Sequence, residues 1–243
     1  MTSYLITGSS RGIGLEITRQ LVESNAEITI FAAARSATSP GFQDLLERHP
    51  TQIIHVPLEV TSENSIKAAV SLVTEKLNGR GLDVLINNAG VMNAARLEDM
   101  TDLDETFRIN VSGVHSVTRA FLPIMREGRE KKILNMSSTV GSIALQPDFR
   151  MTPVPSYKVT KAALNMLTVL YADELKDEGF TVFCVSPGWL KTELGGEHAD
   201  LPVETGVKSV LEILSSVGGE DNGQFFNIEV PGWEKYQREK VPW

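Results

Sequence analysis

The residues best suited to chemistry in this chain are a tyrosine and a lysine four positions apart, Tyr157 and Lys161. On a helix, positions i and i+4 share a face, so the two side chains would lie together. A nearby ammonium favours the ionised phenol, and we expect Lys161 to lower the pKa of Tyr157 from its ordinary value of about 10. Such a tyrosine could exchange a proton near neutral pH as a general acid or base. The pattern alone is common, and its alternative interpretation is a half-buried tyrosine beside a solvated lysine.

A phosphate-binding turn is predicted near the start of the chain. A short apolar run ends at Thr7, three glycines follow at positions 8, 12 and 14, and apolar residues then recur at helical spacing. A strand, a glycine turn and a helix N-terminus together present free backbone N–H groups and a helix dipole to an anion. Glycine also lets the backbone approach the phosphates closely, because it has no Cβ. The pattern therefore predicts a pyrophosphate site.

Apolar runs alternate with amphipathic stretches along the rest of the chain. After the first strand, we expect strands at residues 28–33, 52–56, 82–87, 133–137, 181–186 and 224–228. We expect helices at residues 42–49, 65–77, 114–125, 156–178 and 204–216. This alternation is typical of βαβ units and of a parallel sheet covered on both faces. The fold class is therefore α/β, with one doubly wound, Rossmann-like sheet of about seven strands in a single domain over residues 1–243.

Composition argues against several classes of protein. The net charge of −8 is unsuited to non-specific nucleic-acid binding, which needs basic patches. No apolar run reaches the ~20 residues that span a bilayer, and the first strand begins too close to Met1 for a signal peptide, so we expect a cytoplasmic protein. The single cysteine, Cys184, lies in an apolar run and is expected in the core, without an intrachain disulfide. The histidines are scattered, and we predict no metal site.

In their order, these motifs resemble the short-chain dehydrogenase/reductase family. The resemblance rests on the glycine turn after Thr7, Asn87-Asn88-Ala89-Gly90, Ser138, Tyr157-x-x-x-Lys161 and Pro187-Gly188, and it extends from residue 2 to about residue 230. Residues 161–166, 187–192 and 241–243 are most similar to the carbonyl-reductase and C-factor-like branch. The resemblance implies an enzyme that reduces a small-molecule ketone or aldehyde to the alcohol by hydride transfer. It also implies a homodimer or homotetramer.

By this resemblance, the catalytic residues are Asn110, Ser138, Tyr157 and Lys161. Ser138 stands three residues before a glycine and just past a predicted strand, where side chains enter the crevice at the carboxyl edge of a sheet. It would hydrogen-bond the carbonyl oxygen while Tyr157 delivers the proton. Asparagine is disfavoured inside helices, so Asn110 is expected to mark a local break whose carbonyl holds a relay water. Ser156, which follows two prolines, is expected to cap the helix that carries Tyr157.

We predict NADP(H) as the cofactor. About 20 residues past the glycine turn, an NAD site usually has an acidic residue for the ribose. Arg35 and Ser36 stand there instead, and Arg11 lies inside the glycine turn. A guanidinium suits a 2′-phosphate, although both arginines could also be solvated loop charges. The resemblance implies further cofactor contacts from Gly8, Ser10, Gly12, Ile13, Gly14, Glu59, Val60, Asn87, Ala89, Gly90, Asn110, Tyr157, Lys161, Pro187, Gly188, Leu190 and Thr192.

Two loops are expected to border the substrate. Residues 142–155 lengthen the interval between Ser138 and Tyr157, and their alternative role is a surface excursion. Residues 193–202 would form a second lid. Asn88 is expected to tie neighbouring strands together. Two alternatives to a reductase stay open: a cofactor-binding signalling or regulatory protein with little turnover, and a redox-neutral dehydratase or epimerase on the same scaffold.

Overall fold

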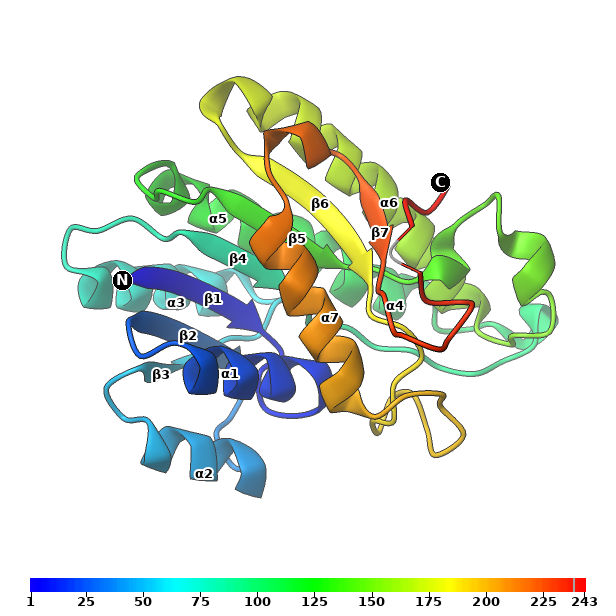
Figure 1. Cartoon of the computed structure of the whole chain (residues 1–243), viewed down its shortest axis with the longest axis horizontal. Coiled ribbons are helices and arrows are strands. Elements are labelled where there is room, and N and C mark those ends of the chain that lie inside the picture. Colours follow the sequence, from blue (N-terminus) through cyan, green and yellow to red (C-terminus); the bar gives the residue numbers. More distant parts are fainter. Residues whose placement is uncertain (238) are drawn as a thin grey trace.

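Seven parallel strands form one sheet in the order β3-β2-β1-β4-β5-β6-β7 (Figure 1). The structure is a computed structural model that describes residues 1–237 and 239–243. The strands are β1 (Thr2–Thr7), β2 (Ile28–Ala34), β3 (Ile53–Pro57), β4 (Val84–Asn87), β5 (Lys132–Met136), β6 (Thr181–Ser186) and β7 (Phe225–Asn227). The order reverses between β1 and β4, as in a doubly wound sheet, so the predicted fold class is confirmed.

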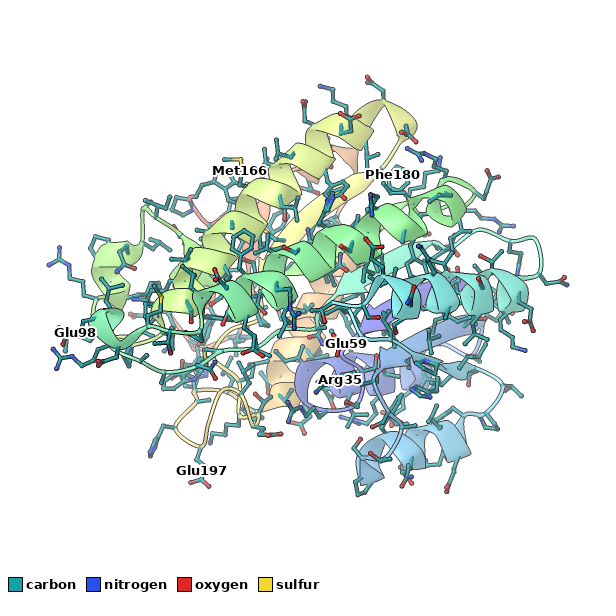
Figure 2. The ribbon with its side chains drawn as sticks, turned by 180° about the vertical axis from the view of Figure 1, so that it is seen from behind. Arg35, Glu59, Glu98, Met166, Phe180 and Glu197 are labelled. Atoms are coloured by element: carbon teal, nitrogen blue, oxygen red, sulfur yellow. The ribbon has the colours of Figure 1, made fainter. Side chains whose placement is uncertain are left out.

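Helices cover both faces of the sheet. They are α1 (Gly12–Ser24), α2 (Pro40–Arg48), α3 (Glu63–Leu77), α4 (Leu103–Phe107), α5 (Val114–Arg126), α6 (Pro155–Leu175) and α7 (Val203–Ser216). One apolar cluster packs α1, α2 and α7 against the sheet, and the other packs α3, α5 and α6 against its opposite face. Figure 1 shows α1 and α7 in front of the sheet, and Figure 2 shows the other layer from behind.

The strands read as continuous apolar runs because both of their faces are buried. In β1, Leu5 and Ile6 are fully buried, and they belong to opposite clusters, since successive side chains in a strand point to opposite faces. Every residue of β6 is buried, from Thr181 to Ser186, and its bounds match the prediction. The other strands shift by one or two residues at their ends. Packing on both faces thus explains why the sheet could be predicted.

The start of α6 differs from the prediction. Pro155 occupies the first turn of the helix, and Val154 precedes it at the N-cap position. Proline is tolerated there because its missing N–H would have no helical partner in any case. The prediction that Ser156 caps this helix is therefore wrong, because Ser156 lies inside the first turn. Its hydroxyl donates to Asp102 instead.

A π-helix, Arg108–Gly113, joins α4 to α5 and contains Asn110. This confirms the predicted local break in the helical pattern. Short 3₁₀ turns occur at Thr139–Gly141, directly after Ser138, and at Gln146–Phe149 within the 142–155 loop. None of the helices in the described residues is long and apolar enough to cross a membrane.

Candidate active site

A cavity of about 560 Å³ lies at the carboxyl edge of the sheet. Its wall is built from the ends of β1 and β2, the segments after β3, β4, β5 and β6, the first turns of α6, and the segment 192–194. Doubly wound sheets bind their ligands in this crevice, at the point where the strand order reverses. The topology therefore brings the separate sequence motifs together at one site.

The glycine turn is folded as a close-approach site. Gly8 and Gly12 have φ values of +73° and +53°, which only glycine adopts readily. A Cβ at Gly14 would lie 2.3 Å from the Gly8 carbonyl oxygen, so only a glycine fits between the turn and α1. The N-terminus of α1 carries no side-chain cap, which leaves its backbone N–H groups to the cavity side of the turn. These residues fit the pyrophosphate of a dinucleotide.

Tyr157 and Lys161 share the face of α6 that lines the cavity. The Lys161 Nζ lies 5.2 Å from the centre of the Tyr157 ring, and it donates a 2.6 Å hydrogen bond to the Met136 carbonyl at the end of β5. Ser138 lies two residues past the end of β5, and its side chain is near enough to that of Tyr157 to lower the pKa of the phenol. The predicted proton donor, lysine and serine therefore meet at one point.

Burial decides the protonation of this pair. Burial raises the pKa of the Tyr157 phenol well above its ordinary value, and the hydrogen bond with Ser138 lowers it by less. Burial also lowers the pKa of Lys161 to about 8. The predicted lowering of the Tyr157 pKa by Lys161 is therefore wrong for this arrangement, because desolvation outweighs the charge of a lysine that bonds a carbonyl instead of the phenol. Tyr157 holds its proton at neutral pH.

Asn110 is buried, and its side chain joins two walls of the site. Its Oδ1 accepts from the Val91 N–H at 2.9 Å, and its Nδ2 donates to the Val91 carbonyl at 2.9 Å and to the Thr160 hydroxyl at 3.1 Å. Thr160 in turn donates to the Tyr157 carbonyl. The amide thus fixes the segment after β4 against the first turns of α6.

Both arginines predicted to bind a 2′-phosphate line the cavity and are paired with carboxylates. Arg35 Nη1 lies 3.8 Å from Glu59 Oε2, with the Arg35 side chain 78% exposed. Figure 2 labels the two residues next to each other. Arg11 forms an ion pair with Glu193, which connects the glycine turn to the predicted lid. Exposed pairs of this kind are weak, so a phosphate could take over either guanidinium.

The structure places most predicted cofactor contacts on the cavity wall, but not all of them. Those on the wall are Gly8, Ser10, Arg11, Gly12, Ile13, Arg35, Glu59, Val60, Ala89, Gly90, Tyr157, Lys161, Pro187 and Thr192. Those outside it are Gly14, Ser36, Asn87, Asn110, Gly188 and Leu190, and the predicted catalytic residue Ser138 also lies outside it. Leu190 is buried in the core, and the Ser36 hydroxyl is hydrogen-bonded to that of Thr38. Gly188 is packed against Ile228, which a Cβ would approach to 2.8 Å.

The two adjacent asparagines have different roles, and only the role of Asn88 agrees with its prediction. Asn87 is buried, and its Nδ2 donates to Thr118 at 3.0 Å and to Asn135 at 2.8 Å, so its predicted cofactor contact is corrected to a contact within the core. Asn88 donates to the Thr7 carbonyl at 2.9 Å, which confirms that it ties β4 to β1. It also lines the cavity. Asn87 is the last residue of β4 and Asn88 follows it directly.

Several residues of the cavity wall were not predicted. Arg108 and Ile109 belong to the π-helix, and Met92 and Asn93 follow the asparagine motif. Only their closeness in sequence to Asn110 and Gly90 could have indicated them. Among the described residues, no group of three or more histidine, cysteine, aspartate or glutamate side chains could hold a metal ion.

Residues 3–200 match the family model described as short chain dehydrogenase, and the chain belongs to that family. Among solved structures, it is similar to the NADPH-bound carbonyl reductase from chicken fatty liver, with a TM-score of 0.90 and 34% identity over 100% of this chain and 99% of that one. Carbonyl reductase Sniffer of D. melanogaster has the same TM-score at 27% identity and covers 100% of both chains. C-signal of Myxococcus xanthus is 36% identical over 165 residues, which are 67% of this chain and 93% of that protein. These findings confirm the family resemblance and the branch.

Proposed function

We propose that this protein is an NADP(H)-dependent oxidoreductase that reduces a small-molecule ketone or aldehyde to the alcohol. The observation that carries the proposal is the position of Tyr157 on the wall of a cavity large enough for a nicotinamide ring and a small carbonyl compound, with Lys161 Nζ 5.2 Å from its ring and Ser138 near enough to lower its pKa. A binding protein needs no protonated phenol beside a serine and a lysine. Proton donation to a developing alkoxide does need one.

The cofactor site is supported by the glycine turn and by the two arginines. Gly8, Gly12 and the N-terminus of α1 would hold the pyrophosphate, and Arg11 and Arg35 would hold the 2′-phosphate. When bound, NADPH would supply a hydride to the substrate carbonyl carbon. The NADPH named with the chicken carbonyl reductase, at 34% identity, agrees with this choice of cofactor.

Side chains of this protein would position the substrate and transfer the proton. Ser138 would donate a hydrogen bond to the substrate oxygen, which places that oxygen within reach of the Tyr157 hydroxyl. Because burial keeps Tyr157 protonated, the phenol is ready to release its proton as negative charge develops on the oxygen. Lys161 would offset the phenolate that results, and the Asn110 backbone would hold a water on the path to solvent.

Tyr157→Phe tests the proposal. We expect NADPH oxidation across a panel of ketones, aldehydes and quinones with the unaltered protein, a preference for NADPH over NADH, and loss of turnover in the variant. NADPH binding, measured by fluorescence, should persist in the variant because the phenyl ring keeps the wall of the cavity. Turnover that survives in Tyr157→Phe would refute the role of the phenol.

A second candidate is a cofactor-binding signalling protein with little turnover. The 36% identity to a protein named C-signal favours it. Tight NADPH binding without oxidation on any carbonyl compound would select this candidate, or a redox-neutral dehydratase or epimerase that consumes no NADPH. We also keep the substrate role of residues 142–155 and 193–202 as a proposal. A homo-oligomer is supported by the exposed apolar Met166 and Leu170 on α6, the first of them labelled in Figure 2.

A further inference from the structure

A carboxylate outside the predicted catalytic residues is bonded to three segments of the site. Asp102 Oδ2 accepts hydrogen bonds from Asn93 Nδ2 at 2.8 Å, Thr106 Oγ1 at 3.0 Å and Ser156 Oγ at 3.0 Å. Asn93 lines the cavity after β4, Thr106 is a buried residue of α4, and Ser156 is the buried residue before Tyr157. One oxygen atom therefore joins the cavity wall, α4 and the first turn of α6.

Neither Asp102 nor Ser156 uses its side chain to cap its own helix. Aspartate and serine are among the best N-cap residues, and Asp102 stands at the N-cap of α4. Its side chain nevertheless makes no capping bond, and Ser156 lies inside α6. The Ser156 hydroxyl donates to Asp102 across the two helix starts, and Asp102 also accepts from the Thr106 side chain of α4. A tertiary bond between the two helix starts has replaced two local caps.

Side-chain hydrogen bonds fix the first turns of α6 at several points, and one of them joins Lys161 to the Met136 carbonyl. The Lys158 Nζ donates to the Phe149 carbonyl at 2.5 Å, and Thr160 is bonded to Asn110. The Ser156 bond to Asp102 is the contact nearest to Tyr157 on the N-terminal side. A small rotation of this turn would move the Tyr157 hydroxyl away from Ser138 and from the substrate oxygen. Misplacement by about 1 Å can cost up to roughly 100-fold in rate.

We propose that Asp102 is a positioning residue for Tyr157, acting through Ser156. The proposal rests on the function proposed above, since it assigns a support to the proton donor of that reaction. The three donors also hold the pKa of the Asp102 carboxyl below its ordinary value, with Asn93 contributing most, so the carboxylate is present as an acceptor at neutral pH. Asp102 itself is expected to touch neither substrate nor cofactor.

Ser156→Ala and Asp102→Ala test the inference, with Thr106→Val as the matched control. We expect Ser156→Ala and Asp102→Ala to lower kcat about 10-fold, with the NADPH dissociation constant within about twofold of the unaltered protein. Thr106→Val removes a donor to the same oxygen, but one that is not next to Tyr157, and should leave kcat within about twofold. Asp102→Asn should recover most of the activity, since its amide oxygen can still accept from Ser156.

Two further measurements separate the possible outcomes. The effects of Asp102→Ala and Ser156→Ala should not add in the double variant, because both remove the same bond. If Ser156→Ala keeps full kcat, or if Thr106→Val loses as much as Ser156→Ala, the positioning role is wrong, and this holds even where Asp102→Ala fails to fold. The unaltered protein and Tyr157→Phe are run in the same series. If the unaltered protein itself does not reduce any carbonyl compound, the proposed function fails, and this inference fails with it.

Discussion

Burying Lys161 has a cost to stability that can be measured. Its side chain is 4% exposed, and burial lowers its pKa from an ordinary value of 10.5 to about 8. That change corresponds to about 3 kcal/mol, at about 1.36 kcal/mol per pKa unit. The sign follows from proton binding: between pH 8 and 10.5 the unfolded chain binds more protons at this site, so stability rises with pH there. Below pH 8 the full cost is present.

Lys161→Met removes this titration. Without added cofactor, the variant should be more stable than the unaltered protein at pH 7, because it no longer buries a charged lysine. About 1 kcal/mol of this gain is lost, because the Met136 carbonyl loses its hydrogen bond. The decisive quantity is the difference in unfolding free energy between the two proteins, measured by urea denaturation. Because the loss at Met136 does not change with pH, this difference should shrink by about 2 kcal/mol between pH 7 and about pH 10.

Lys158→Met is the control for this experiment. Lys158 is also on the first turns of α6, and burial lowers its pKa as well, but it lies closer to solvent. Its substitution should therefore give a much weaker dependence on pH. This prediction is refuted if the difference in unfolding free energy between Lys161→Met and the unaltered protein stays constant from pH 7 to about pH 10. Lys161 would then have the same pKa in the folded and the unfolded protein.

Three other substitutions test the cofactor site and the lid. Arg35→Asp should raise the KM for NADPH by at least 10-fold and leave that for NADH nearly unchanged, because only the 2′-phosphate meets the new charge; equal effects on both would remove the NADP assignment. Gly14→Ala should weaken NADPH binding by at least 10-fold, since its Cβ would displace the Gly8 carbonyl; Gly218→Ala, where a Cβ meets no atom within 4 Å, is the control and should bind NADPH normally. Tyr236→Phe should lower the unfolding free energy by about 1–2 kcal/mol, because its hydroxyl donates to Asp200 at 2.6 Å and accepts from the Trp189 N–H at the base of the lid; an unchanged urea midpoint would contradict this.

The sheet could be predicted because its signal is local. The central strands are buried on both faces, so they appear in the sequence as short apolar runs, and β6 could be located to the residue. The glycine turn could be predicted for a similar reason, since its backbone conformation and its close packing allow only glycine at fixed spacing. In both cases, burial or backbone conformation restricts the residue type at that same position, so the sequence itself carries the signal.

Side-chain partners could not be predicted in this way, because they come from distant segments. The residue type and position of Ser156 favour a helix cap, yet its hydroxyl bonds Asp102, which is 54 positions away in the sequence. Asn87 and Asn88 are chemically identical, yet Asn87, the last residue of β4, bonds within the core, whereas Asn88, directly after β4, lines the cavity. The predictions for Ser156 and Asn87 fail for one reason. A local preference of about 1 kcal/mol is easily outweighed by tertiary contacts.

The sequence predicted a lowered pKa for Tyr157, whereas the structure raises it, and this changes which direction of the reaction the site favours. A sequence shows that a charge is near the phenol, but it does not show how dry the pair is. Burial favours the neutral form of each group, so it raises the pKa of Tyr157 and lowers that of Lys161 to about 8. At neutral pH the phenol therefore keeps its proton, while the lysine is still mostly charged. That is the protonation state from which a carbonyl oxygen can be protonated at once, whereas oxidation of an alcohol would first require the phenol to ionise.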